Sequence, residues 1–180
     1  MNLANKLTLL RIILVPVFMV FLLNKITYGE YLAAGVFILA ALTDSLDGYI
    51  ARKHNQVTKL GKLMDPIADK LLVTAALISL VQMDKLSAWI AMVIIAREFV
   101  VTGLRSIAAS EGQVIAASIW GKLKTISQVV AVVAIILNNF PFSYIGISFD
   151  QIAIWTAVAL TLISLADYLY KCRKIFINSR

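Results

Sequence analysis

Residues 44–69 read DSLDGYIARKHNQVTKLGKLMDPIAD and interrupt a chain that is otherwise strongly apolar. The stretch contains four carboxylates, Asp44, Asp47, Asp65 and Asp69, between hydrophobic runs. Acidic side chains are costly in apolar surroundings unless a partner neutralises their charge. We expect that partner to be a metal ion, and we expect the metal to serve chemistry on a lipid.

The composition is that of an all-α integral membrane protein. Hydrophobic residues make up 61% of the 180 residues, and the mean hydropathy is +0.87, whereas a soluble domain has about 45–50% apolar residues. The net charge of +7 indicates cytoplasmic ends and contact with anionic lipids, and we expect no nucleic-acid partner. Cys172 is the only cysteine, which excludes an intramolecular disulfide. The length favours a single domain over residues 1–180.

Six segments are predicted to be transmembrane helices, each of which needs about 20 predominantly apolar residues. They cover residues 7–24, 31–52, 62–82, 87–108, 115–138 and 147–171. The connections are short, so we expect an up-and-down order without soluble insertions. No small-residue cleavage site follows the first run, which we interpret as a retained helix.

The basic residues predict the orientation. A cytoplasmic N-terminus places every lysine and arginine except Lys25 and Lys85 on the cytoplasmic side, as the positive-inside rule requires. Both termini are then cytoplasmic, and a short chain without a targeting sequence favours a bacterial inner membrane. The four aspartates would lie at the cytoplasmic ends of the second and third helices. Because the 53–61 connection is short, we expect these helices to be antiparallel neighbours and the aspartates to face one cavity.

The spacing of the aspartates suits metal binding. Asp44 and Asp47 are spaced i, i+3, while Asp65 and Asp69 are spaced i, i+4, so each pair shares one helical face. Aspartate oxygens together with a phosphate suit Mg²⁺ or Mn²⁺ better than zinc. Two such ions on a diphosphate would stabilise both the attacking and the leaving oxygen.

Small residues accompany the aspartates. Gly48 and Ala51 continue the face of Asp44 and Asp47 with almost no side chain, which lets a bulky group approach the backbone. Arg52 ends this face, and its planar guanidinium suits phosphate. Gly61 supplies another small position at the entry of the third helix.

Two other interpretations of the aspartates are open. They could form structural ion pairs with Lys62, Lys70 or Arg52, but such pairs leave the small residues unexplained. They could line a cation path, as intramembrane carboxylates often do. A transporter fits badly, because the acids gather at one interface and no matching set lies in the outer halves of the segments.

The pattern Asp44-x2-Asp47-Gly48-x2-Ala51-Arg52-x8-Gly61-x3-Asp65-x3-Asp69 resembles the complete signature of the CDP-alcohol phosphatidyltransferases. The resemblance implies six transmembrane helices around a cytoplasm-facing site, usually in a homodimer. It implies a binuclear metal site on Asp44, Asp47 and Asp65, with Asp69 as both ligand and general base. The CDP moiety would be bound by Asp44, Gly48, Ala51, Arg52 and Gly61.

The reaction that this resemblance implies is a displacement at phosphorus. Asp69 would remove the proton of an acceptor hydroxyl, and the alkoxide would attack the β-phosphorus of a CDP-linked lipid. CMP would leave with its charge stabilised by the metals and Arg52. Nothing in the sequence indicates a covalent enzyme intermediate.

A second polar cluster indicates the acceptor. Arg105, Lys122 and Lys124 are all predicted near the cytoplasmic side, and a basic pocket beside a metal site suits a phosphorylated alcohol. Lys122 and Lys124 do not share a helical face, so we expect only one of them to point into the pocket. Alternatively, both extend to lipid headgroups. Arg97 and Glu98 lie deeper and need partners in other helices.

Further motifs resemble the phosphatidylglycerolphosphate synthase branch of the family. They are Asn5-x2-Thr8-x2-Arg11, the Ala96-Arg97-Glu98 run with Arg105, and Gly121-Lys122-x-Lys124-Thr125. The resemblance implies CDP-diacylglycerol and sn-glycerol 3-phosphate as substrates, with Thr8 and Arg11 added to the acceptor site. Inositol phosphate, serine or phosphatidylglycerol stay open as other acceptors, and Thr8 and Arg11 could be only the polar start of a helix. Beyond residue 125 we expect only lipid-facing helices.

Overall fold

The computed structural model describes residues 3–24, 26–54, 59–110, 112 and 118–178, and the side chains of 8–24, 26–43, 67, 68, 70–110, 112 and 118–173. The described residues form six α-helices and one short 3-10 helix, η1. These are α1 (Leu3–Leu23), α2 (Gly29–His54), α3 (Lys59–Gln82), α4 (Ala88–Ser110), α5 (Ile119–Ile136), η1 (Phe142–Ile145) and α6 (Phe149–Asn178). The predicted all-α fold and the six helices are confirmed, with α2 and α3 extending further into the predicted 53–61 connection.

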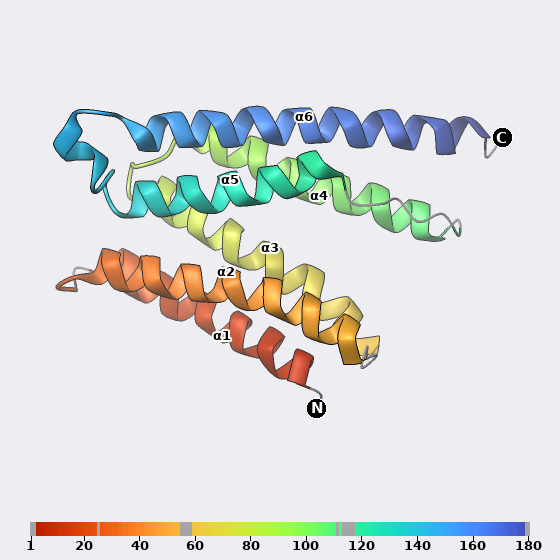
Figure 1. The fold of residues 1–180 in the computed structure, drawn as a ribbon, viewed down its shortest axis with the longest axis horizontal. Coiled ribbons are helices and arrows are strands. Elements are labelled where there is room, and N and C mark those ends of the chain that lie inside the picture. Colours follow the sequence, from red (N-terminus) through yellow and green to blue (C-terminus); the bar gives the residue numbers. More distant parts are fainter. Residues whose placement is uncertain (1–2, 25, 55–58, 111, 113–117, 179–180) are drawn as a thin grey trace.

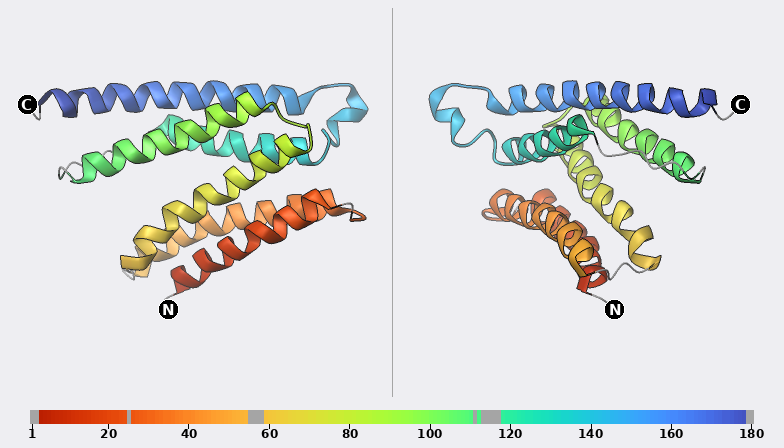
Figure 2. Two further views of the ribbon diagram at one scale, coloured as in Figure 1. Left: turned by 180° about the vertical axis from the view of Figure 1, so that it is seen from behind. Right: turned by 45° about the vertical axis from the view of Figure 1, so that its right-hand side comes forward.

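The helices run up and down and fall into two groups (Figure 1). Helices α1 and α2 lie side by side, α4, α5 and α6 form the second group, and α3 crosses obliquely between them. Figure 2 shows that α3 begins beside the end of α2 and then diverges from it toward α4. The two chain termini lie at the same end of the molecule as the end of α2 and the start of α3. Residues 44–69 are therefore at that end.

Small residues allow the helices to pack closely. The buried positions include many alanines, such as Ala33, Ala76 and Ala157, none of which is exposed at all. Larger side chains fill the space between α1 and α2, where the ring centroids of Phe18 and Phe37 are 5.6 Å apart. Lipid tails are as apolar as the side chains, so the hydrophobic effect does not drive helices together in a bilayer. Close van der Waals packing of small residues is instead a main source of helix association there.

Large apolar side chains are abundant on the outside of the molecule. Trp89 is 81% exposed, and Leu39 and Ile126 are each 62% exposed. So many exposed large apolar side chains are unusual for a protein surrounded by water and indicate a surface that something else covers. Among the described residues, Ile119–Ile136 and Phe149–Arg173 are long and apolar enough to cross a bilayer. That all six helices cross it stays a prediction.

Candidate active site

The backbone places the signature residues on two helix ends that meet. Asp44 and Asp47 lie in the last three turns of α2, and Asp65 and Asp69 lie in the first three turns of α3. Their side chains lie outside the described residues. The same holds for four other predicted site residues: Gly48, Ala51, Arg52 and Gly61. Because α2 ends where α3 begins, the two pairs are at one end of the molecule (Figure 1).

Thr8 and Arg11 of α1 are buried. Thr8 is 3% exposed and Arg11 is 1% exposed. They are three residues apart and so share a face of α1, the helix that packs against both α2 and α3. A merely polar helix start would leave these side chains in solvent, so their burial favours an interior role.

The second polar cluster is centred on the Glu98 carboxylate of α4. Lys124 of α5 donates a hydrogen bond to Glu98 Oε1. Arg97 Nη1 donates to the same oxygen at 3.3 Å. Lys124 is only 4% exposed, so its ammonium is buried between the helices. One carboxylate thus pairs with two buried cations.

The other end of Arg97 is held by α6. Its Nη2 donates to Ser164 Oγ, and its guanidinium carbon lies 5.7 Å from the centre of the Tyr168 ring. Arg97 is 6% exposed. The expectation that Arg97 and Glu98 need partners in other helices is confirmed, since α5 and α6 provide them.

A third helix joins this cluster through Lys70. Lys70 Nζ donates to Thr102 Oγ1, and Thr102 in turn donates to the backbone carbonyl of Glu98 at 2.7 Å. Lys70 directly follows Asp69 in α3. The cluster at Glu98 is therefore connected to the helix that contains the predicted general base.

The remaining predicted basic residues face outward. Lys122 and Arg105 are exposed, whereas Lys124 is buried. The expectation that Lys122 and Lys124 do not share a helical face is confirmed, and that only one of them points into an acceptor pocket stays a prediction. Of the three predicted basic residues, Lys124 is the one within the polar cluster.

The prediction that residues beyond 125 form only lipid-facing helices is wrong. Gln128, Thr161 and Ser164 are buried, and Gln128 Nε2 donates to Thr161 Oγ1 at 3.1 Å. Thr161, Ser164 and Tyr168 follow an i, i+3, i+7 pattern that places them on one face of α6. That spacing of hydroxyl groups in an apolar run is the sequence signal that could have revealed an inward face.

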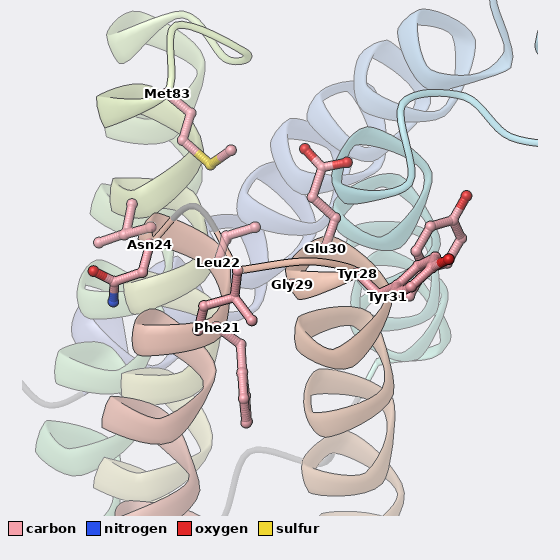
Figure 3. A pocket seen from close by; sticks show the side chains of 10 residues that line it. Phe21, Leu22, Asn24, Tyr28, Gly29, Glu30, Tyr31 and Met83 are labelled. Atoms are coloured by element: carbon pink, nitrogen blue, oxygen red, sulfur yellow. The ribbon is translucent and has the colours of Figure 1, made fainter.

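A cavity of about 490 Å³, seen from close by in Figure 3, lies at the end of the molecule opposite the end of α2 and the start of α3 (Figure 1). It is formed around the turn that joins α1 and α2, with Met83, which directly follows α3. Glu30 is the only charged side chain among its described lining residues, and Tyr28 and Tyr31 point away from it. None of its described lining residues belongs to the polar cluster around Glu98, so the two features are separate.

Comparison with known proteins identifies the family. The family described as CDP-alcohol phosphatidyltransferase matches residues 1–163. The chain belongs to the CDP-alcohol phosphatidyltransferase family. This confirms the family and the transferase class that the aspartate signature predicts. Together with the helical fold and its apolar surface, membership makes the chain a membrane protein.

Relatives within this CDP-alcohol phosphatidyltransferase family match along nearly the whole chain. A CDP-diacylglycerol–glycerol-3-phosphate 3-phosphatidyltransferase of Bacillus subtilis is 48% identical over 182 residues, covering 94% of each chain. Proteins of the same name from Rickettsia felis and Shigella flexneri are 39% and 38% identical. Their matches cover 97% of each chain and, for Shigella, 96% of this chain and 95% of the relative.

Proposed function

We propose that this protein transfers the phosphatidyl group of CDP-diacylglycerol to sn-glycerol 3-phosphate, giving phosphatidylglycerol phosphate and CMP. The observation that carries the proposal is the 48% identity, over 94% of both chains, to a relative whose name states both substrates. The aspartate signature accounts for the reaction, and the buried Lys124 in the Glu98 cluster supplies a cation for the acceptor phosphate.

The donor set of the signature fits the divalent metal ions that the family uses. Four carboxylates on two helix ends that meet are hard oxygen ligands of the kind that Mg²⁺ and Mn²⁺ prefer. Asp44, Asp47, Asp65 and Asp69 would hold two such ions. When bound, the ions would neutralise the diphosphate and stabilise the oxygens that gain negative charge.

The protein's own residues would divide the rest of the reaction between them. Asp69 takes the proton of the acceptor hydroxyl as it attacks the β-phosphorus, so the new P–O bond forms while the bond to CMP breaks. Arg52 stabilises the charge on the departing CMP, and Gly48, Ala51 and Gly61 leave room for the nucleotide. Lys124 binds the acceptor phosphate, and Thr8 and Arg11 of α1, which packs against α2 and α3, are proposed to complete the acceptor site.

The proposed setting is a bacterial inner membrane with both termini in the cytoplasm. The two termini lie at the same end of the molecule as the end of α2 and the start of α3 (Figure 1), which supports a chain that crosses the membrane an even number of times. The distribution of lysine and arginine supports a cytoplasmic location for that end. Both soluble substrate groups would then reach the site from the cytoplasm. We also propose a homodimer, as the family resemblance implies.

The test is transfer of label from radioactive glycerol 3-phosphate to lipid by purified protein in vesicles with CDP-diacylglycerol. Wild-type protein should incorporate label with Mg²⁺ or Mn²⁺ and lose activity in EDTA. Asp69→Asn should reduce incorporation by about 10²–10⁴-fold, the usual contribution of a general base. Undiminished incorporation would remove Asp69 as the base.

The competing acceptors are distinguished by a panel. Inositol phosphate, serine and phosphatidylglycerol are each offered with CDP-diacylglycerol, and CMP release is measured. Preference for one of them over glycerol 3-phosphate would replace the proposed acceptor and keep the reaction class. Metal flux into vesicles without CMP release would instead indicate a cation transporter.

A further inference from the structure

Helix α6 presents a polar face to the interior of the molecule. Ser164 and Thr161 have no exposed surface, and Tyr168 is 3% exposed. The same face meets α5 closely, because a Cβ added at Gly121 would lie 3.8 Å from Ser164 Oγ and from the Tyr168 ring. Ser164 and Tyr168 lie beyond the 1–163 range of the family match.

These two side chains contact a buried guanidinium, that of Arg97. Arg97 Nη2 donates to Ser164, and the Tyr168 ring lies beside the guanidinium at 5.7 Å. Arg97 Nε has no hydrogen-bond partner among the described residues. Apart from these contacts with α6, its described polar contact is with Glu98.

The position of Arg97 affects Lys124 through the carboxylate that they share. Both cations donate to Glu98 Oε1. A shift of the guanidinium would move or reorient this carboxylate, and the Lys124 ammonium would follow. A lysine side chain that is free to move loses rotamer entropy when it is ordered. Holding Lys124 in place beforehand therefore favours phosphate binding.

We propose that Ser164 and Tyr168 are positioning residues for the acceptor. They hold Arg97, Arg97 orients Glu98, and Glu98 fixes Lys124 for the phosphate of the incoming alcohol. The proposal rests on the proposed function, because it concerns the affinity for glycerol 3-phosphate. Neither α6 residue needs to touch the acceptor for this effect.

The first test compares two buried hydroxyl groups on the same face of α6. Ser164→Ala removes the bond to Arg97, while the control Thr161→Val removes the bond to Gln128 and leaves the Arg97 contacts intact. Ser164→Ala should raise the KM for glycerol 3-phosphate about five- to twentyfold, as expected for one hydrogen bond to a charged group. The KM for CDP-diacylglycerol and the melting temperature should change no more than in Thr161→Val.

The second test separates the Tyr168 ring from its hydroxyl. Tyr168→Phe keeps the ring beside the guanidinium, and should leave the KM for glycerol 3-phosphate within about twofold of the wild-type value. Tyr168→Leu removes the aromatic face, and should raise that KM about threefold to tenfold. A KM for glycerol 3-phosphate that stays near the wild-type value in Tyr168→Phe but rises in Tyr168→Leu would show that the aromatic ring is needed. If Tyr168 only filled space, leucine would serve nearly as well as phenylalanine.

Several outcomes would overturn the positioning role. They are an unchanged KM for glycerol 3-phosphate in Ser164→Ala, an equal rise in the KM of both substrates, or equal effects of Ser164→Ala and Thr161→Val. These results differ from a failure of the proposed function. In that case the wild-type protein itself would not use glycerol 3-phosphate.

Discussion

At the scale of single residues, Lys122 and Lys124 show how burial separates two similar side chains. They are two positions apart on α5, yet Lys122 is exposed and Lys124 is 4% exposed and bonded to Glu98. Both are lysines near the start of the same helix, so the local sequence does not show which of the two side chains is buried. The packing of α5, which lies mainly against α6, places Lys124 in the interior beside Glu98 of α4 and leaves Lys122 outside.

Replacing these lysines should therefore have unequal effects. Lys124→Ala is expected to raise the KM for glycerol 3-phosphate at least about tenfold, because a charge-assisted contact to phosphate is lost. Lys122→Ala is the matched control and should change it less than about threefold. The measurement is CMP release against acceptor concentration. Equal effects of the two substitutions would contradict the assignment.

The need of Arg97 and Glu98 for partners could be predicted, but the partners themselves could not. A charge in an apolar run must be paired, whatever the fold. Which residue pairs with it depends on the axial position of α6 relative to α4, and local spacing does not determine that position. Serine and tyrosine also occur on lipid-facing helices. The spacing of Ser164 and Tyr168 on one face of α6 is therefore only weak evidence, in the sequence, that this face points inward.

At the scale of the elements, Gly29 determines how closely α2 can begin beside α1. A Cβ at this position would lie 2.5 Å from the backbone oxygen of Phe21. Backbone atoms cannot give way as a flexible side chain can. By contrast, Gly35 lies in the same helix with nothing within 4 Å of an added Cβ.

Alanine should thus have opposite effects at the two glycines. Gly29→Ala should lower the free energy of unfolding by about 1–3 kcal/mol, because overpacking forces the two helices apart. Gly35→Ala should leave it unchanged or raise it by up to about 1 kcal/mol through better helix propensity. Unfolding in mixed detergent micelles measures both. A neutral Gly29→Ala would show that the α1–α2 turn adjusts freely.

A polar contact joins three elements at the end opposite the aspartates. Glu30 at the start of α2 accepts from Lys85 at 2.6 Å, just after α3, and from Asn138, just after α5. Glu30 and Lys85 are 36% and 22% exposed, so solvent screens their attraction. The contact therefore contributes little to stability.

Lys85→Ala should lower the free energy of unfolding by less than about 1 kcal/mol, as is usual for partly exposed ion pairs. Both KM values should stay at their wild-type levels because the pair is remote from the aspartates. Thermal unfolding in detergent and CMP release provide the two measurements. A rise in the KM for glycerol 3-phosphate comparable with that of Lys124→Ala would contradict this separation of the two ends.

The sequence predicted the order and approximate limits of the helices because long apolar runs leave few alternatives. The ends were less predictable. Residues 53–61 are predicted to be a connection, but α2 continues to His54 and α3 already begins at Lys59. Polar residues are compatible with a helix that extends past the apolar layer. The divergence of α3 from α2 was not predictable, since it depends on the packing of α3 against α1.

At the scale of the whole molecule, the exposed aromatic residues at one end support a membrane interface there. Tyr28, Trp89 and Tyr144 are 72%, 81% and 83% exposed, and they lie near the turns opposite the chain termini. Tyrosine and tryptophan are enriched where a helix leaves the hydrocarbon layer. The sequence assigns only Lys25 and Lys85 of the lysines and arginines to the outer side of the membrane, and the described Lys85 lies just after α3 at this end.

The predicted orientation can be tested by cysteine labelling. In a Cys172→Ser background, which has no other cysteine, Tyr144→Cys should react with a membrane-impermeant maleimide in right-side-out vesicles. Lys122→Cys should react only after the vesicles are opened, because the positive-inside rule places it in the cytoplasm. The reverse pattern would invert the topology.

The sharing of Glu98 by Arg97 and Lys124 has a consequence for evolution. Changing any one of these three residues leaves a charge buried between the helices without its present partner. This costs far more free energy than changing all three residues together. We therefore expect epistasis at these positions. In related sequences, substitutions at these three positions should occur together, and few single substitutions should be tolerated.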